Sequence, residues 1–289
     1  MLALIDGDIV AYRCSASAEN EPEDIALLRV EVMMRDILHE TESTEYKSFL
    51  TGQGNFRYDI YPDYKANRKD KPKPTHLKAC RTYLLDTWKS YLSEGCEADD
   101  LIGIEATAAD DMMSYIICSI DKDLKQIPGY HYNFVTKDKV FVSPLDGLKS
   151  FYKQLILGDV SDNIPGYDGK ARQKWPKFMQ HHHDAIDSFY DELDMYDYVR
   201  NIYTENAHDI ILNGRLLFIQ RKENQQWIPP NLQVEVRGES EGDVTEESPV
   251  RTGQTEVPAT TSNTDIHPWL EGQGDRKSTR LNSSHIPLS

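Results

Sequence analysis

The sequence predicts an α/β protein in which acidic side chains gather at one edge of a sheet. Short apolar runs at residues 2–5 and 115–118 have the length of buried strands, and acidic residues follow each of them. A third apolar run, residues 155–157, is also followed by acids. Functional sites of open α/β sheets lie outside the carboxyl ends of the strands, so we expect these acids to converge there. Converging acids repel one another and resist burial, and divalent cations relieve both costs.

The length and composition are those of one large domain, or of a core with an extension. The chain has 289 residues, of which 39% are hydrophobic. No apolar run approaches the length needed to cross a membrane, and the first residues lack the basic segment of a signal peptide. We therefore expect a cytoplasmic protein without a membrane partner. No Cys-x-x-Cys spacing occurs, which favours reduced, buried thiols at Cys14, Cys80, Cys96 and Cys118.

The charge is strongly but unevenly acidic. The formal net charge of -16 argues by itself against nucleic-acid binding, because proteins that bind nucleic acids usually have a basic surface. One basic island, residues 57–81, stands out against this background, and aromatic residues are interleaved at its start. Its prolines predict a mobile loop with short helical pieces.

The N-terminal part is predicted to contain two strands and a long helix. Residues 2–5 form the first strand, which ends at Asp6-Gly7-Asp8. Residues 23–40 carry apolar residues broadly at helical spacing. Residues 46–50 are the second strand candidate, closed by the polar, glycine-containing turn at residues 51–55. The apolar positions of the helix are Ile25, Leu28, Val32 and Leu38.

The rest of the chain alternates helices and strands. Residues 75–93 are predicted to form a helix that is capped near Gly95, and residues 97–110 form another with acids at its start. A strand follows at residues 113–119. The remaining predicted elements are a hairpin at 130–142, a helix at 145–157 and helical pieces from 170 to about 220.

The last part of the chain, residues 236–289, is rich in Gly, Ser, Thr, Glu and Pro and has no periodicity. Such a composition predicts disorder. Residues 275–289 resemble the translation of a sequencing-adapter read-through, so we exclude them from the interpretation of fold and function. On this interpretation the natural C-terminus is missing.

Five motifs occur in order along roughly the first 170 residues. They are Asp6-Gly7, Tyr61-Pro62-x-Tyr64-Lys65-x-Asn67-Arg68, Glu97-Ala98-Asp99-Asp100, Asp121-Lys122-Asp123 and Gly158-Asp159-x-x-Asp162-Asn163-Ile164-Pro165-Gly166. Together they resemble the flap endonuclease and 5′→3′ exonuclease family of the PIN-like superfamily, and its bacteriophage members most closely. One such motif alone would be weakly specific, whereas the ordered set is highly specific.

The resemblance implies a PIN-like α/β core with a central, mostly parallel sheet flanked by helices. The core would span residues 1–165 and carry a basic helical arch at about 57–81, with a helical DNA-binding region at 166–235. The resemblance also implies two metal sites. The acids that match the first site are Asp6, Glu97, Asp99 and Asp100, and those that match the second are Asp121, Asp123, Asp159 and Asp162.

The same resemblance assigns roles to the basic island. Lys65 and Arg68 match arch residues that act on the scissile phosphate, and their spacing places both on one face of a helical turn. Tyr64 matches an aromatic residue that stacks near the reacting nucleotide; packing within the arch is the alternative. Lys69 and Lys170 are further candidate nucleic-acid contacts. The alternative for these basic residues is a solvated loop.

Two departures from the family pattern affect the predicted sites. The family often has a further acid in the segment that is residues 51–55 here, where this chain has none. The first metal site is therefore expected to have fewer direct ligands. The loop after Pro165-Gly166 also lacks the usual Gly-Ile-Gly, which puts a bound potassium ion and tight duplex anchoring in doubt.

The ligand chemistry favours two hard cations, Mg²⁺ or Mn²⁺, because every proposed ligand is a carboxylate. Such a pair activates water and stabilises the leaving oxygen in phosphodiester hydrolysis. Isolated acids are more often simply solvated, but these recur after apolar runs. The adjacent His181, His182 and His183 point in different directions on a helix and are not predicted to bind metal.

The leading hypothesis is a divalent-metal-dependent 5′→3′ exonuclease and flap endonuclease. It would act on DNA with 5′ ends or flaps, with RNA primers in RNA·DNA hybrids as a further candidate substrate, in the host cytoplasm if phage-encoded. No oligomeric state is implied. The alternatives are a PIN-type ribonuclease and a catalytically silent DNA junction-binding protein. The residues predicted to carry catalysis are Asp6, Lys65, Arg68, Glu97, Asp99 and Asp121.

Overall fold

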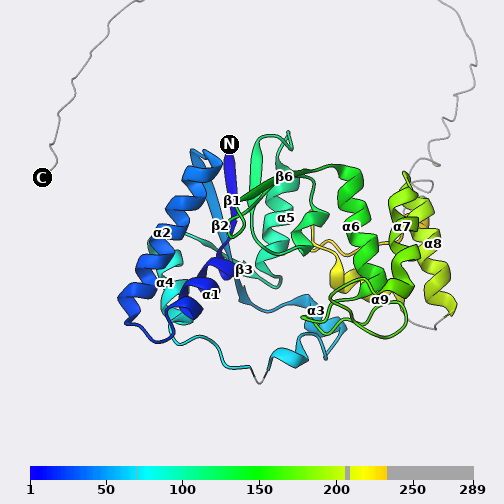
Figure 1. Cartoon of the computed structure of the whole chain (residues 1–289), viewed down its shortest axis with the longest axis horizontal. Helices are drawn as coiled ribbons and strands as arrows, with labels where there is room; N and C mark the ends of the chain where they lie inside the picture. The colour runs from blue at the N-terminus through cyan, green and yellow to red at the C-terminus, as the bar shows by residue number, and fades with distance from the viewer. Residues whose placement is uncertain (70, 206–208, 233–289) are drawn as a thin grey trace, which may run out of the picture. The chain divides into compact units, whose positions relative to one another are not determined.

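A computed structural model describes residues 1–69, 71–205 and 209–232. In the described residues a single six-stranded sheet has the order β3-β2-β1-β4-β5-β6 (Figure 1). The first five strands run parallel and β6 runs antiparallel to β5. The predicted α/β class with a mostly parallel sheet is therefore confirmed. The strands are β1 (Leu2–Asp6), β2 (Glu45–Gln53), β3 (Tyr91–Glu94), β4 (Tyr115–Cys118), β5 (Gly129–Asn133) and β6 (Asp138–Val142).

The register of the three central strands aligns their carboxyl ends. In β1, Asp6 pairs with Phe49 of β2, and Ile5 pairs with Cys118, the last residue of β4. Because parallel strands in this register end together, the residues that follow β1 and β4 emerge at the same edge of the sheet. The pairing thus brings together acids that are more than a hundred positions apart in the sequence.

Three helices cover one face of the sheet (Figure 1): α1 (Gly7–Ser17), α2 (Glu23–Thr41) and α4 (Leu77–Asp86). The predicted helix at 23–40 is confirmed, but its buried face was predicted wrongly in part. Leu28 and Val32 are 56% and 48% exposed, and Ala26, Val30 and Met34 face the sheet instead. The apolar residues of this helix occupy more than one face, so their spacing alone did not determine which of them the packing against the sheet would bury. Helix α1 was not predicted.

The opposite face of the sheet is covered by α5 (Ala98–Ala108), whose Ile102 and Ala106 pack with Leu4 of β1 and Ile117 of β4. A capping box starts this helix: the Glu97 side chain accepts from the backbone of Asp100, and Asp100 accepts from the backbone N–H of Glu97. The helix therefore begins at the edge where the central strands end.

The remaining helices form a second packed region with its own hydrophobic cluster: α6 (Pro144–Leu157), α7 (Gln180–Ser188), α8 (Glu192–Glu205) and α9 (Ile210–Leu217). Ser143 caps α6 by accepting from the N–H of Asp146 at 3.1 Å. Phe151 and Trp227 lie in this cluster with ring centroids 5.5 Å apart. The boundary predicted at residue 165 between core and DNA-binding region stays a prediction.

The predicted helix at 75–93 is correct only in its first half. Helix α4 ends at Asp86, and Tyr91–Glu94 forms the edge strand β3, which pairs with β2 through Phe49 and Tyr91. Lys89 has a left-handed backbone (φ 51°), which reverses the chain between the two elements. These residues form a strand because they pair with the edge of β2. This pairing is a long-range contact, so the local spacing of apolar residues in the sequence does not predict it.

The other predicted helices and strands agree with the structure, but the turn predicted at residues 51–55 is wrong in its first half, because β2 continues to Gln53. The hairpin at 130–142 is β5 and β6, and the four cysteines are free and buried. Short helices complete the chain: α3 (Phe56–Ile60) and the 3-10 turns η1 (Ala66–Arg68), η2 (Asp123–Gln126) and η3 (Lys177–Met179). No helix in the described part of the chain is both long and apolar enough to span a bilayer. The tail predicted to be disordered, residues 236–289, lies outside the described residues.

Candidate metal and phosphate site

A pocket of about 210 Å³ opens at the edge of the sheet where β1 and β4 end. All the predicted metal ligands except Asp100 line it, together with Asp8, which was not among them. Three cationic side chains, Lys65, Arg68 and Lys122, border the same pocket. The acids that line it are Asp6, Asp8, Glu97, Asp99, Asp121, Asp123, Asp159 and Asp162.

Two strand ends hold the deepest acids. Asp6 closes β1 and caps α1 by accepting from the N–H of Ile9 at 3.1 Å. Its second oxygen accepts from the hydroxyl of Ser119, just after β4, at 2.7 Å. The same hydroxyl accepts from the N–H of Asp121, whose own carboxylate accepts from the N–H of Asp123, each at 2.9 Å. The turn after β4 thus fixes three acids relative to one another.

The last two acids come from a tight loop after α6. The backbones of Asp159 and Ile164 bond in both directions, at 2.8 and 2.9 Å, and close the loop. Inside it the carboxylate of Asp159 accepts from the N–H of Asp162 at 2.9 Å. Gly158 precedes the loop with φ +67°, and a Cβ there would lie 2.3 Å from the backbone oxygen of Ile164. Only glycine fits, so the motif's first residue is explained by packing.

Burial and mutual repulsion raise the pKa values of four of the pocket acids, Asp6, Asp99, Asp121 and Asp123. Burial, partly offset by hydrogen bonds from Ser119 and Ile9, raises the pKa of Asp6 from 3.8 to about 7. Burial, then the charges of neighbouring acids, also raises the pKa of Asp99 and Asp123, and burial raises that of Asp121. The pocket therefore concentrates more negative charge than its own hydrogen bonds neutralise.

The donor set fits divalent cations. All the acidic groups are hard oxygen donors, and the buried Oδ1 of Asp123 has no hydrogen-bond partner among the described residues. Among the described residues, no three His, Cys, Asp or Glu side chains are placed close enough together to hold a metal ion as they stand. The carboxylates line the pocket from several sides, so they supply the donor atoms but not a preformed coordination sphere.

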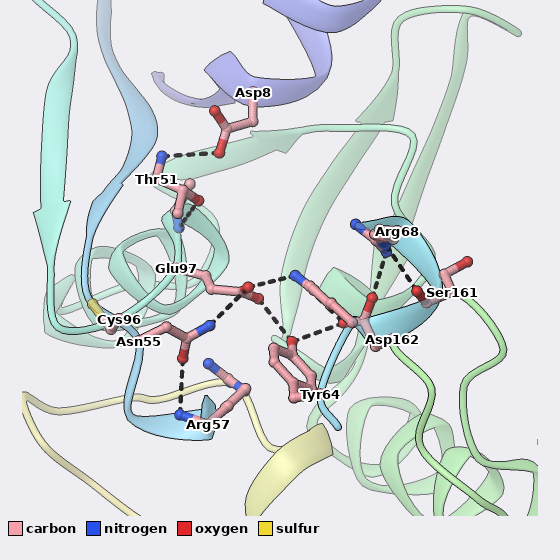
Figure 2. A network of polar contacts seen from close by, with 12 residues as sticks. Asp8, Thr51, Asn55, Arg57, Tyr64, Arg68, Cys96, Glu97, Ser161 and Asp162 are labelled. Carbon is pink, nitrogen blue, oxygen red and sulfur yellow. Dashed lines mark hydrogen bonds and ion pairs between the residues drawn. The ribbon is translucent and has the colours of Figure 1, made fainter. Parts of the chain in front are cut away.

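Glu97 contacts three side chains beside the pocket (Figure 2). Its carboxylate accepts from Asn55 at 2.9 Å, lies 3.1 Å from the phenol oxygen of Tyr64 and pairs with Lys65. The Tyr64 phenol also bonds the carboxylate of Asp162, at 2.8 Å. One side chain of the basic island therefore links an acid of α5 to an acid of the loop after α6.

The structure buries the ring of Tyr64, which agrees with the alternative of packing within the arch, and the stacking role stays a prediction. The ring is 1% exposed, packs in the hydrophobic cluster of the C-terminal helices and lies 5.4 Å from the ring of Tyr58. The buried phenol keeps a hydrogen-bond partner, because its hydroxyl donates to the carboxylate of Asp162. The position of Tyr64 in a basic segment of the sequence did not indicate that its ring packs among the C-terminal helices.

Lys65 and Arg68 both line the pocket, although Lys65 precedes the 3-10 turn η1 with a left-handed backbone (φ 55°) and does not share a helical face with Arg68 as the spacing predicted. Lys65 pairs with Glu97 and, at 3.5 Å, with Asp162. Arg68 pairs with Asp162 and donates to the backbone oxygen of Ser161 at 2.8 Å. Burial alone would lower the pKa of Lys65, but Glu97 and Asp162 raise it, so the ammonium stays charged.

The metal-ligand role predicted for Asp100 is wrong, because its side chain does not face the pocket. Its carboxylate forms a bidentate pair with Arg57 and accepts from the N–H groups of Glu97 and Gln220, each at 3.0 Å. Asp99 and Asp100 are neighbours on one helix, so they point in directions about 100° apart and only one can enter the pocket. Arg57, counted in the basic island, is likewise buried in this pair and is not a phosphate-binding group.

The remaining candidates lie outside the pocket. Lys69 and Lys170 are exposed and do not line it. In the altered loop, Arg172 pairs with Asp168 at 2.6 Å. Among the histidines, His182 hydrogen-bonds the hydroxyl of Tyr198 at 2.7 Å, so its role is in packing.

Sequence reasoning missed Asp8, although its signal was present. It stands two residues after Asp6, at the start of the unpredicted helix α1. Its carboxylate accepts from the backbone N–H of Thr51 at 2.9 Å and pairs with Arg81 (Figure 2 shows the bond to Thr51). A prediction of α1 would have placed Asp8 on the side of the helix that faces the end of β2.

Comparison with known sequences places the N-terminal part among nucleases. Residues 1–150 match the family model described as 5′-3′ exonuclease, N-terminal resolvase-like domain. DNA polymerase I of Bacillus caldotenax is 30% identical over 205 residues, which are 62% of this chain and 23% of that protein. DNA polymerase I of Chloroflexus aurantiacus is 27% identical over 197 residues, 58% of this chain and 21% of that protein. The chain thus spans about a quarter of these relatives' length.

Comparison with solved structures finds the same fold in a bacteriophage protein. The T5 D15 protein, co-crystallised with metal ions, superposes with a TM-score of 0.58 at 18% identity, over 76% of this chain and 89% of that one. A complex of the bacteriophage T5 D15 flap endonuclease with DNA and metal ions gives a TM-score of 0.53 at 18% identity, over 76% and 88%. These proteins share the mostly parallel sheet flanked by helices, the PIN-like fold that the motifs implied.

Proposed function

Since the chain belongs to the 5′-3′ exonuclease and flap endonuclease family, we propose that it is a divalent-metal-dependent nuclease. It would hydrolyse phosphodiester bonds of DNA near 5′ ends, both as a 5′→3′ exonuclease and at flaps. The observation that carries this proposal is the convergence of acids from β1, α5, the turn after β4 and the loop after α6 on one pocket bordered by Lys65 and Arg68.

The cofactor would be a pair of Mg²⁺ or Mn²⁺ ions held by the pocket carboxylates. When bound, such ions activate water and stabilise the leaving oxygen. Asp6, Glu97 and Asp99 would serve the first ion. The acids that would serve the second are Asp121, Asp123, Asp159 and Asp162. The raised pKa values of Asp6, Asp99, Asp121 and Asp123 support cation binding at this place, as does the Oδ1 of Asp123, which has no hydrogen-bond partner among the described residues.

Two cationic side chains would bind the scissile phosphate. Lys65 and Arg68 lie against the carboxylates, so a phosphate that enters the pocket meets an ammonium and a guanidinium that donate charged hydrogen bonds. Developing negative charge on the phosphate is stabilised by the same groups. Cations bound by Glu97 and Asp162 would release Lys65 and Arg68 from their present ion pairs and free them for the phosphate.

The substrate and setting are proposed from the relatives. The T5 protein was solved with DNA and metal ions, and the matched polymerases act on DNA, which supports DNA as the partner. Exposed Lys69 and Lys170 would contact the backbone beside the pocket. RNA primers in RNA·DNA hybrids are a further candidate substrate. We place the activity in DNA replication in the cytoplasm, the host cytoplasm if the gene is a phage gene.

The test is cleavage of a 5′-labelled DNA flap in Mg²⁺ by the wild-type chain and by Asp121→Asn with Asp123→Asn. Wild type is expected to cut at the flap junction, and the double variant is expected to lose at least about 100-fold in rate. A matched control is Asp187→Asn, which also removes an ion-paired acid but far from the pocket. Equal cleavage by wild type and the double variant would defeat the proposal.

Two rival functions give different results in the same assay. A PIN-type ribonuclease would cleave single-stranded RNA and spare the flap. A silent junction-binding protein would bind the flap in EDTA and cleave nothing when Mg²⁺ is restored. The lack of an acid at residues 51–55 is what keeps the second rival open.

A further inference from the structure

The carboxyl end of β2 adjoins the pocket but offers it no carboxylate. Thr51 lines the pocket, and its hydroxyl accepts from the N–H of Ala98 at 3.0 Å. Gly52 follows, where an added Cβ would lie 2.0 Å from the backbone oxygen of Ser93. No side chain fits at that position as the strands are placed. The pocket is therefore short of one acid on this side.

Asp8 reaches this side from α1. A Cβ on Gly7 would lie 2.7 Å from the backbone oxygen of Phe49, so the start of α1 packs directly against β2. That close approach brings the carboxylate of Asp8 onto the N–H of Thr51, at 2.9 Å, and into the pocket lining (Figure 2). The side chain is 29% exposed, so it is open to solvent ions.

One cation already contacts this carboxylate. Arg81 of α4 pairs with Asp8 and donates to the backbone oxygen of Thr51. A guanidinium beside a carboxylate lowers the affinity of that carboxylate for another cation, because the two positive charges repel each other. Across the pocket, the unpartnered Oδ1 of Asp123 is a second, independent sign that the pocket is built to receive a ligand.

We propose that Asp8 supplies the pocket with the cation-binding carboxylate that β2 lacks, and that Arg81 is its competing counter-ion. This inference rests on the proposed function, in that the pocket must bind divalent cations. It assigns Asp8 to the cation side of the site and Arg81 to the control of its affinity. Removing the charge of Asp8 must then weaken cation binding, and removing the charge of Arg81 must strengthen it.

The experiment measures Mn²⁺ binding to the full chain without DNA, from the electron paramagnetic resonance signal of the free ion. Wild type, Asp8→Asn, Arg81→Gln and Asp121→Asn are compared with the control Asp168→Asn. That control removes an acid that is similarly exposed, 22%, and similarly paired with an arginine, outside the pocket. Asp8→Asn keeps an oxygen for the N–H of Thr51 and loses the charge together with the acceptor for Arg81.

Asp8→Asn is expected to weaken Mn²⁺ binding about 3- to 10-fold, and Arg81→Gln to tighten it by a similar factor, while Asp168→Asn binds like wild type. Asp8→Asn binding as tightly as wild type overturns the inference. If Asp8→Asn fails to fold, Arg81→Gln decides alone, and unchanged or weaker binding by it overturns the inference as well. Absence of Mn²⁺ binding by wild type instead defeats the proposed function.

Discussion

Arg57 and Asp100 form a buried, bidentate ion pair, with nitrogen–oxygen distances of 2.6 and 3.0 Å. The guanidinium also donates to the backbone oxygens of Leu216 and Phe218, at 2.8 Å each. This one pair therefore joins α3, the start of α5 and the end of α9. The two adjacent acids of this motif therefore have different roles: Asp100 pairs with Arg57 inside the fold, and Asp99 lines the pocket.

The different roles of the two acids predict opposite phenotypes. Asp100→Asn leaves the buried Arg57 without its counter-charge and should cost about 3–5 kcal/mol of unfolding free energy, with Mn²⁺ affinity of the folded protein unchanged. Asp99→Asn removes a repelled charge, so it should weaken Mn²⁺ binding without a comparable loss of stability. Urea unfolding and Mn²⁺ titration of both variants check this. A metal defect in folded Asp100→Asn would mean that Asp100 is a ligand after all.

Tyr64 provides a second prediction, because its ring and its hydroxyl have separate functions. Tyr64→Phe keeps the buried ring and removes the bond to Asp162 and the contact with Glu97. The rate of flap cleavage should fall about 10-fold or more, because the hydroxyl contributes about 1–2 kcal/mol to holding the two carboxylates in position. The affinity for the flap in EDTA should not change. The control is Tyr58→Phe, on the neighbouring exposed ring. If Tyr64 acted by stacking, Tyr64→Phe would keep the aromatic ring and flap cleavage would be unchanged.

Removal of the Lys65 ammonium should separate cation binding from catalysis. Lys65→Met leaves Glu97 without a competing cation, so Mn²⁺ should bind more tightly. Flap cleavage should nevertheless fall about 100- to 1,000-fold, because a positive donor to the scissile phosphate is lost. Lys170→Met, which changes an exposed lysine outside the pocket, serves as control and should alter only DNA affinity. Weaker Mn²⁺ binding in Lys65→Met would show that Lys65 supports the carboxylates and does not compete for them.

The raised pKa of Asp6, about 7 against an ordinary 3.8, predicts a pH dependence of stability. A carboxyl that binds its proton more tightly in the folded chain stabilises the fold at low pH, and this contribution is lost as the pH rises from about 4 to about 7. In EDTA, the melting temperature of wild type relative to that of Asp6→Asn should therefore fall across this range. Mg²⁺ should abolish the fall, because it neutralises the ionised acid. A difference that is flat in EDTA contradicts the assignment.

Much of the fold follows from local sequence. Buried strands such as β1 and β4 and amphipathic helices such as α2 and α6 are encoded by the spacing of their own apolar residues. The edge strand β3 is different, because Tyr91–Glu94 becomes a strand only by pairing with β2. An element that depends on a distant partner leaves no reliable local pattern.

By itself, the sequence determined that acids would follow the ends of strands and the end of a helix. The parallel register of the strands then brought the carboxylates of Asp6 and Asp121 to one edge of the sheet. Only the tertiary structure decided which acids enter the pocket. Asp99 points into the pocket, whereas Asp100 points towards Arg57. The buried Tyr64 links two carboxylates through its hydroxyl. The packing of α1 on β2 places Asp8 in the pocket lining. The physical reason is that spacing along the chain sets which residues can share a face, whereas charge pairing and packing across elements set where each side chain points.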